Sequence, residues 1–194
     1  MNDKIYKCIG ASNHAKSKRQ PYDYYATEPK AAKLLLLAEP DLDMIWECAC
    51  GEGHLADIFF DARKLALATD LIDRGYPLMN KTLDFLSDDN KGYWHGDIVS
   101  NPPYKYAQQF VEKAMSLLRG NRKLCLFLKL TFLEGKARKE MFAKYPPKTI
   151  YVCSSRIPCA KNGKFQKHQA SAVAYAWFVW QKDFDGCPSV KWIN

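Results

Sequence analysis

The sequence predicts one α/β domain built on a mostly parallel, doubly wound sheet that ends in an antiparallel hairpin. Short apolar segments alternate with segments of helical composition up to about residue 145. The last two apolar segments, residues 149–153 and 172–180, follow each other without a helix between them. Alternating strands and helices are typical of a parallel sheet, whereas two consecutive strands favour an antiparallel pair. We expect this domain to span residues 22–194, after a basic, partly flexible arm at residues 1–21.

The composition is that of a soluble protein with reduced thiols. With 194 residues, 47% of them hydrophobic, the chain can bury the core of one domain. No apolar run approaches the roughly 18 residues of a membrane span, and the first residues do not form a secretory signal. The seven cysteines are odd in number and scattered, and no C-x-x-C pair complements Cys48 and Cys50. We therefore expect a cytoplasmic protein without a metal or a membrane anchor.

The positive charge is concentrated in two segments. The net charge is +8, of which residues 1–20 carry +4 and residues 156–170 carry the other +4, with no acid in the second segment. Clustered cations are typical of a surface that binds a polyanion. A flexible tail and a solvated loop would give the same count.

The first elements of the domain are an aromatic segment and a helix. Thr27 has the side chain of an N-cap, Glu28 and Pro29 suit a first turn, and the apolar run ends at Ala38, before Pro40. We expect a helix over this run, capped by Thr27.

A nucleotide-type loop is predicted next. An apolar strand at residues 44–49 runs into Gly51 and Gly53, which permit positive φ and a close approach of the backbone to a ligand, and a helix is expected from about His54. Asp70 ends the following strand, residues 65–69, where a carboxylate can accept hydrogen bonds from ribose hydroxyls. A dinucleotide-binding loop would look similar, because that fingerprint tolerates the alanine found at position 56.

The remaining elements follow in the same order. Residues 93–97 lead into another strand. Apolar residues at spacings of three and four predict a helix at residues 107–118, which Gly120 ends. A buried strand at residues 124–130 and a helix at residues 134–144 complete the alternation.

The string Asn101-Pro102-Pro103-Tyr104 is the strongest chemical signal. The Asn101 side chain offers a carbonyl, and the two prolines restrict the backbone so that the carbonyl of Pro102 has a fixed direction. Tyr104 offers an aromatic face. Two acceptors and a ring suit a planar group that carries an amine, although a proline-rich turn is a simpler interpretation.

These residues together resemble class I S-adenosylmethionine-dependent DNA adenine-N6 methyltransferases, and their order resembles that of the small phage and prophage enzymes. The resemblance covers about residues 22–182. It implies a Rossmann-like fold with a seven-stranded sheet in the order 3-2-1-4-5-7-6, whose third strand would lie at residues 83–86. It also implies S-adenosylmethionine as cofactor, DNA as partner, a monomer or weak dimer, and the cytoplasm of a bacterium or an infected host.

The resemblance also assigns roles to residues of this chain. It implies catalytic roles for Asn101, Pro102, Pro103 and Tyr104. Cofactor contacts are implied for Tyr25, Thr27, Glu28, Glu47, Cys48, Ala49, Gly51, Gly53, His54, Asp70, Leu71, Asp84, Phe85 and Asn101, with Asp88 as the alternative to Asp84. Nucleic-acid contacts are implied for Arg156, Lys161, Lys164, Phe165 and Lys167.

One departure from the family pattern lies in the basic loop. Arg156 fits, but Cys159 stands where an aromatic residue is usual, so we expect Phe165 to be the stacking residue of this loop. We expect no separate target-recognition domain within these 194 residues and therefore a short or relaxed sequence specificity. Three alternatives stay open: an RNA adenine, a glutamine amide of a protein, or a nucleic-acid-binding protein without catalysis.

Overall fold

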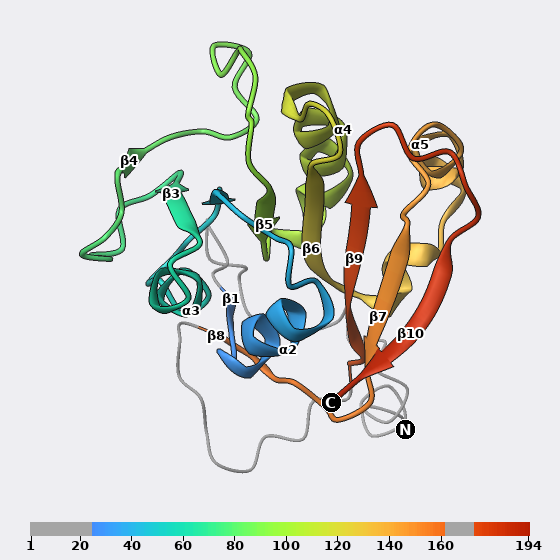
Figure 1. Cartoon of the computed structure of the whole chain (residues 1–194), viewed down its shortest axis with the longest axis horizontal. Coiled ribbons are helices and arrows are strands. Elements are labelled where there is room, and N and C mark those ends of the chain that lie inside the picture. The colour runs from blue at the N-terminus through green and yellow to red at the C-terminus, as the bar shows by residue number, and fades with distance from the viewer. Residues whose placement is uncertain (1–24, 162–172) are drawn as a thin grey trace, which may run out of the picture.

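The computed structural model describes residues 25–161 and 173–194. An eight-stranded sheet forms the centre of this part of the chain, and a separate two-stranded sheet lies beside it (Figure 1). The strands of the large sheet are β2 (Ile45–Glu47), β3 (Leu65–Asp70), β4 (Lys81–Thr82), β5 (Ile98–Ser100), β6 (Lys123–Lys129), β7 (Thr149–Cys153), β9 (Tyr175–Gln181) and β10 (Ser189–Ile193). The small sheet pairs β1 (Tyr25–Thr27) with β8 (Cys159–Lys161) in antiparallel fashion.

The topology of the large sheet confirms the predicted fold class. Its order is β4-β3-β2-β5-β6-β9-β7-β10, so the first seven positions follow the expected order 3-2-1-4-5-7-6. β9 runs antiparallel to both of its neighbours, and the other pairings are parallel. The eighth strand, β10, corrects the predicted count of seven. Its residues are mostly exposed, and Ser189 and Lys191 interrupt its apolar residues, so it lacks the continuous apolar run that marks the buried strands.

Four α-helices of the described residues cover the two faces of the sheet. They are α2 (Lys30–Ala38), α3 (Ala56–Asp61), α4 (Ala107–Leu117) and α5 (Lys139–Lys144), and three 3-10 helices adjoin them: η1 (Tyr104–Tyr106), η2 (Leu130–Leu133) and η3 (Lys136–Arg138). The side chains of α2 and α3 pack on one face, and those of α4 and α5 pack on the other. Strand β6 contributes to both layers, since Leu124, Leu126 and Leu128 face α4 and Cys125 and Phe127 face α2. The sheet is therefore buried on both sides, as a parallel sheet requires.

Several predicted boundaries need correction. Helix α2 begins at Lys30 and no side chain caps it; Thr27 belongs to β1. Helix α3 begins at Ala56, two residues after His54, and has only six residues. The third strand, β4, precedes the predicted residues 83–86, so Asp84 lies in the loop that follows it. These segments are short, and their ends are set by contacts with distant parts of the chain.

In the described part of the chain, no helix has the length and apolar character to cross a bilayer.

Candidate active site

Three parallel strands place polar residues at one edge of the sheet. Glu47 ends β2, Asp70 ends β3, and Asn101 follows directly after Ser100 at the end of β5. Because the carboxyl ends of parallel strands meet at the same edge, these four residues of three adjacent strands share one edge. In open α/β sheets this edge is where ligands bind, at the point where the strand order reverses. Here the order reverses between β2 and β5.

The glycine-containing loop is fixed to Asp70. The N–H of Gly51 donates to Asp70 Oδ2 at 2.8 Å, and the N–H of Ile72 donates to Oδ1 at 3.0 Å. Gly51 and Gly53 have positive φ values of 57° and 89°. At Gly53 the close approach is to the ring of Tyr76, because a Cβ there would lie 2.1 Å from Tyr76 Cε2. The loop is thus held by protein contacts, and each Asp70 oxygen keeps a lone pair for a ligand.

Glu47 is a buried carboxyl with an unused oxygen. Its Oε1 accepts from the N–H of Ala49 at 3.2 Å, whereas Oε2 has no partner among the described residues. The nearby hydroxyl of Ser100 is buried and likewise lacks a partner in this part of the chain. Burial raises the pKa of Glu47 to about 8, against the opposing effects of the Ala49 N–H and of the Ser100 hydroxyl, which lies close to the carboxyl without the geometry of a hydrogen bond. At neutral pH the side chain is therefore mostly a neutral acid that can donate or accept a hydrogen bond.

Asn101 is oriented by the small sheet. Its Nδ2 donates to the carbonyl oxygen of Tyr25 at 3.0 Å and to the hydroxyl of Thr27 at 2.7 Å. A backbone carbonyl can only accept, so the nitrogen of the amide must face β1. The opposite atom, Oδ1, is buried and has no partner among the described residues. The amide has used both of its donors, and its free capacity is a single acceptor.

Tyr104 is more enclosed than the sequence predicts for a stacking residue. It lies in η1, half-buried against both layers of the core, and its hydroxyl donates to Cys159 Sγ at 3.5 Å. The ammonium of Lys129 lies 4.9 Å from the ring centroid, over its face. A base that stacks on this face of Tyr104 therefore has to displace Lys129. The exposed ring of Tyr106, two residues on, offers another aromatic surface.

The other predicted cofactor residues divide into two groups. The side chains of Cys48 and Phe85 lie in the core, where Phe85 stacks on Phe110, so only their backbone atoms remain for a ligand. Asp84 is exposed and its Oδ1 accepts from the N–H of Leu86 at 2.9 Å. Exposed Leu71 stands next to Asp70 and can contact an apolar part of a ligand. Ala49, Glu28 and His54 are half-buried, and Asp88 is exposed.

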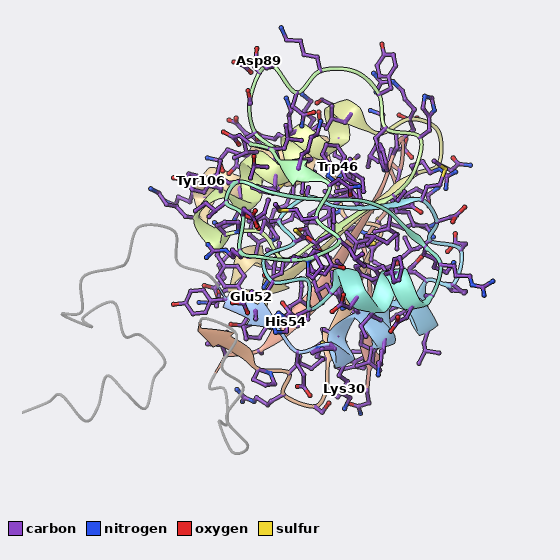
Figure 2. All side chains as sticks on the ribbon, turned by 90° about the vertical axis from the view of Figure 1, so that its left-hand side faces the viewer. Lys30, Trp46, Glu52, His54, Asp89 and Tyr106 are labelled. Carbon is purple, nitrogen blue, oxygen red and sulfur yellow. The ribbon has the colours of Figure 1, made fainter. Side chains whose placement is uncertain are left out.

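The glycine-rich loop and the segment after Asn101 open on the same side of the molecule. Figure 2 shows Glu52 and His54 of the loop, and Tyr106 of η1, on its left-hand side, while Trp46 of β2 lies in the interior. Trp46 is buried, and its Nε1 donates to Thr69 Oγ1 at 2.9 Å, which ties β2 to β3 behind the loop.

The predicted nucleic-acid residues are placed only in part. Arg156 is exposed in the segment between β7 and β8, and the backbone of Lys161 pairs with that of Tyr25. Lys164, Phe165 and Lys167 lie outside the described residues. The structure therefore brings the start of the basic loop to β1, the strand that holds Asn101.

The sequence does not predict four residues of this region as site residues. They are Ser100, Lys129, Tyr76 and Cys159. Ser100 is signalled only by its place before Asn101, and Lys129 only as a cation that ends a buried strand. Tyr76 and Cys159 act through partners far away in the sequence, which no local pattern reveals.

Comparison with known proteins gives a fold but no close relative. Neither a protein-family model nor a curated protein matches the sequence. A proposed RNA methyltransferase from Pyrococcus horikoshii aligns with a TM-score of 0.58 at 14% identity, over 94% of this chain and 98% of its own. A proposed class I S-adenosylmethionine-dependent methyltransferase from Listeria monocytogenes has a TM-score of 0.55 and 16% identity over 83% and 61% of the two chains.

A third similar structure is the M protein of the type I restriction enzyme EcoKI. It aligns with a TM-score of 0.55 at 15% identity, over 84% of this chain and 44% of its own. The chain thus spans less than two thirds of the Listeria and EcoKI proteins. At these identities the likeness is one of fold. The chain has the Rossmann-like fold of these methyltransferases.

Proposed function

We propose that this chain is an S-adenosylmethionine-dependent methyltransferase that acts on the N6 amine of adenine in DNA. The observation that carries the proposal is the state of Asn101, whose amide nitrogen is saturated by β1 and whose buried Oδ1 has no partner among the described residues. A buried acceptor without a partner costs about 1–3 kcal/mol, so it is retained where a ligand supplies the donor. An exocyclic amine is such a donor.

The residues at the sheet edge fit the cofactor. Asp70 keeps two lone pairs for ribose hydroxyls after it has fixed Gly51 and Ile72. Glu47 Oε2 and the Ser100 hydroxyl are buried polar atoms without a partner in the described chain, and they suit a polar group near the ends of β2 and β5. S-adenosylmethionine supplies, when bound, an electrophilic methyl group on a sulfonium.

The chain's own contribution is to hold and orient the amine. Asn101 Oδ1 accepts one amine N–H, and the carbonyl of Pro102, to which no described residue donates, accepts the other. Two acceptors in the plane of these bonds localise the lone pair on nitrogen, which favours attack on carbon. Position and exclusion of water then supply most of the rate, and the proton leaves to solvent.

The positive charge near Asn101 favours DNA over a protein as the substrate. The acid-free segment 156–170 carries +4, and it begins beside β1, next to Asn101. Cations near the acceptor suit a phosphate backbone, and an adenine must leave its helix to reach a buried acceptor. A structured RNA presents the same amine and the same phosphates, and the Pyrococcus horikoshii neighbour is a proposed RNA methyltransferase.

The test is transfer of a labelled methyl group to four acceptors: duplex DNA, single-stranded DNA, RNA and a peptide-chain release factor. Digestion to nucleosides identifies the product. N6-methyladenosine from RNA alone would replace DNA by RNA as the substrate, and label in the release factor alone would assign the glutamine reaction. Failure with all four, by protein that binds S-adenosylmethionine in calorimetry, would overturn adenine methylation.

A further inference from the structure

Strand β1 of the small sheet accepts both of the side-chain hydrogen bonds that Asn101 makes to described residues. Thr27 is only 2% exposed, although it lies in a three-residue strand at the start of the described chain. Its hydroxyl accepts the shorter of the two hydrogen bonds from Asn101, 2.7 Å against 3.0 Å for the Tyr25 carbonyl. An asparagine amide can rotate by half a turn about its last bond, which would exchange Oδ1 and Nδ2. The contacts with β1 decide between these orientations.

We propose that Thr27 is a positioning residue, which holds the Asn101 amide in the orientation that leaves Oδ1 free for the substrate amine. The inference rests on the proposed function and deepens it. With Nδ2 turned toward the substrate, the amide would present a donor to a donor. The Tyr25 carbonyl can only accept and therefore selects this orientation, and the buried Thr27 hydroxyl, which lies against the Cys159 thiol, accepts the second N–H. We call these two contacts the clamp.

The other end of the clamp reaches Tyr104. Thr27 faces Cys159 across the small sheet, and the Cys159 thiol lies against both the Thr27 hydroxyl and the hydroxyl of Tyr104. These contacts form a continuous path from Asn101 through Thr27 and Cys159 to Tyr104. The small sheet thus holds the first and last residues of the Asn-Pro-Pro-Tyr segment at once, and a rigid support of this kind is what a catalytic amide needs.

This role differs from the one that the family resemblance implies for Thr27. A threonine that contacts the cofactor affects cofactor affinity when it is changed, whereas a positioning residue affects turnover. The Thr27 hydroxyl oxygen already accepts from Asn101, and the residue is almost fully buried. We therefore assign its effect to the chemical step.

The test compares Thr27→Val with Thr27→Ser. Valine has the shape of threonine and suits a strand, but it lacks the hydroxyl. We expect Thr27→Val to lower kcat by about 10- to 100-fold, with KM for the acceptor and Kd for S-adenosylmethionine changed by no more than about two-fold. Thr27→Ser restores the hydroxyl and should recover most of the lost rate. The acceptor is the one that the wild type methylates best among the four above.

A control separates the clamp from a general weakening of this region. Lys30 donates to Ser155 Oγ at 3.3 Å, a second side-chain bond between the segment around β1 and the segment before β8. Ser155→Ala removes it without touching Asn101, and kcat should stay within about two-fold of the wild type. A loss of kcat in Ser155→Ala equal to that in Thr27→Val would overturn the specific role of Thr27, as would a raised cofactor Kd in Thr27→Val with unchanged kcat.

A second readout does not depend on activity. In protein labelled with ¹⁵N at asparagine side chains, the Asn101 amide signals are identified by their absence in Asn101→Ser. Both Nδ2 protons should exchange slowly with solvent in the wild type and in Thr27→Ser, and at least about ten-fold faster in Thr27→Val. Unprotected protons in the wild type would overturn the proposal even if methyl transfer is observed. Protected protons in a wild type that methylates none of the four acceptors would leave the clamp standing and overturn the proposed reaction.

Discussion

The two ends of the central sheet treat buried polar groups in opposite ways. At the amino end, Asp97 accepts from the N–H of Asp43 at 2.8 Å and from the N–H of Lys123 at 2.7 Å, and Arg122 lies 3.8 Å from its carboxylate. At the carboxyl end, Glu47 Oε2, Ser100 Oγ and Asn101 Oδ1 are buried and have no partner in the described chain. One end is electrostatically complete, and the other lacks hydrogen-bond partners that a ligand can supply.

The amino end extends this closed network through Lys123. Its ammonium bonds Glu39 and Asp41 at 2.6 Å each, and these hydrogen bonds raise its pKa against the opposing effect of desolvation. Glu39 also accepts from the hydroxyl of Tyr151 at 2.6 Å. Here the loop before β2 is tied to the starts of β5 and β6. The contrast teaches that burial alone does not mark a functional residue, whereas burial without a partner does.

The contrast predicts that Asn101→Ala has the largest effect on activity. Removal of the acceptor leaves the amine without its fixed partner, and we expect methyl transfer to fall by about a thousand-fold or more, about 4 kcal/mol in the transition state. Cofactor affinity in calorimetry and the unfolding midpoint should stay close to the wild type. A variant that still methylates at a comparable rate would show that Asn101 does not hold the amine.

Asp97→Ala should show the reverse pattern. The change leaves two N–H groups without a buried acceptor, so we expect the free energy of unfolding in urea to fall by about 3 kcal/mol. Asp97→Asn keeps one acceptor oxygen and should lose less. Methyl transfer per folded molecule should stay at the wild-type level for both variants. If Asp97→Ala is as stable as the wild type, the hydrogen bonds of Asp97 do not stabilise the amino end of the sheet.

The sequence predicted the fold more completely than the orientation and hydrogen bonds of the site residues. Alternating apolar segments and the two final strands predicted a mostly parallel sheet with an antiparallel hairpin, and the order of its seven strands was implied by the family resemblance. The orientation of Asn101 could not be predicted, since it depends on Tyr25 and Thr27, which lie 76 and 74 positions away. Thr-Glu-Pro is typical of a helix start and predicts that Thr27 caps a helix, but the Thr27 hydroxyl instead accepts a hydrogen bond from Asn101.

The enclosure of Tyr104 and Phe85 could not be predicted for a related reason. Both are aromatic residues in segments that the sequence places near ligands. The Cys159 thiol that meets Tyr104 is 55 residues away, and Phe85 packs against Trp46 and Phe110 from two other elements. Which face of an aromatic ring remains available depends on packing between distant segments, and a local pattern does not contain that information.

The pH dependence of stability tests whether Glu47, at the carboxyl end of the sheet, is a buried neutral acid. Its pKa is raised to about 8 from an ordinary value of 4.5, chiefly by burial. Between these values the unfolded chain has lost the proton that the folded chain retains, so the contribution of Glu47 to stability falls as pH rises, by up to about 1.4 kcal/mol per pH unit.

Glu47→Gln removes this titration. Between pH 5 and pH 8 the free energy of unfolding of the wild type should therefore fall by about 3 kcal/mol more than that of Glu47→Gln. Urea unfolding of both proteins across this range measures the difference. Parallel curves would mean that Glu47 is ionised in the folded protein at neutral pH.

Of these four changes, Asp70→Ala is expected to have the smallest effect. It distinguishes the hydrogen bonds that Asp70 makes to the loop backbone from those that we propose it makes to the ligand. The change removes the carboxylate that accepts from Gly51 and Ile72, and with it the proposed pair of bonds to the ribose. We expect S-adenosylmethionine affinity in calorimetry to fall by about 2–3 kcal/mol. Asp70→Asn keeps one acceptor for Gly51 but has no charge, so it should bind with intermediate affinity at nearly wild-type stability. If both variants bind the cofactor as tightly as the wild type, Asp70 serves only the loop, and the ligand's polar contacts must be sought at Glu47 and Ser100, whose buried oxygens have no partner in the described chain.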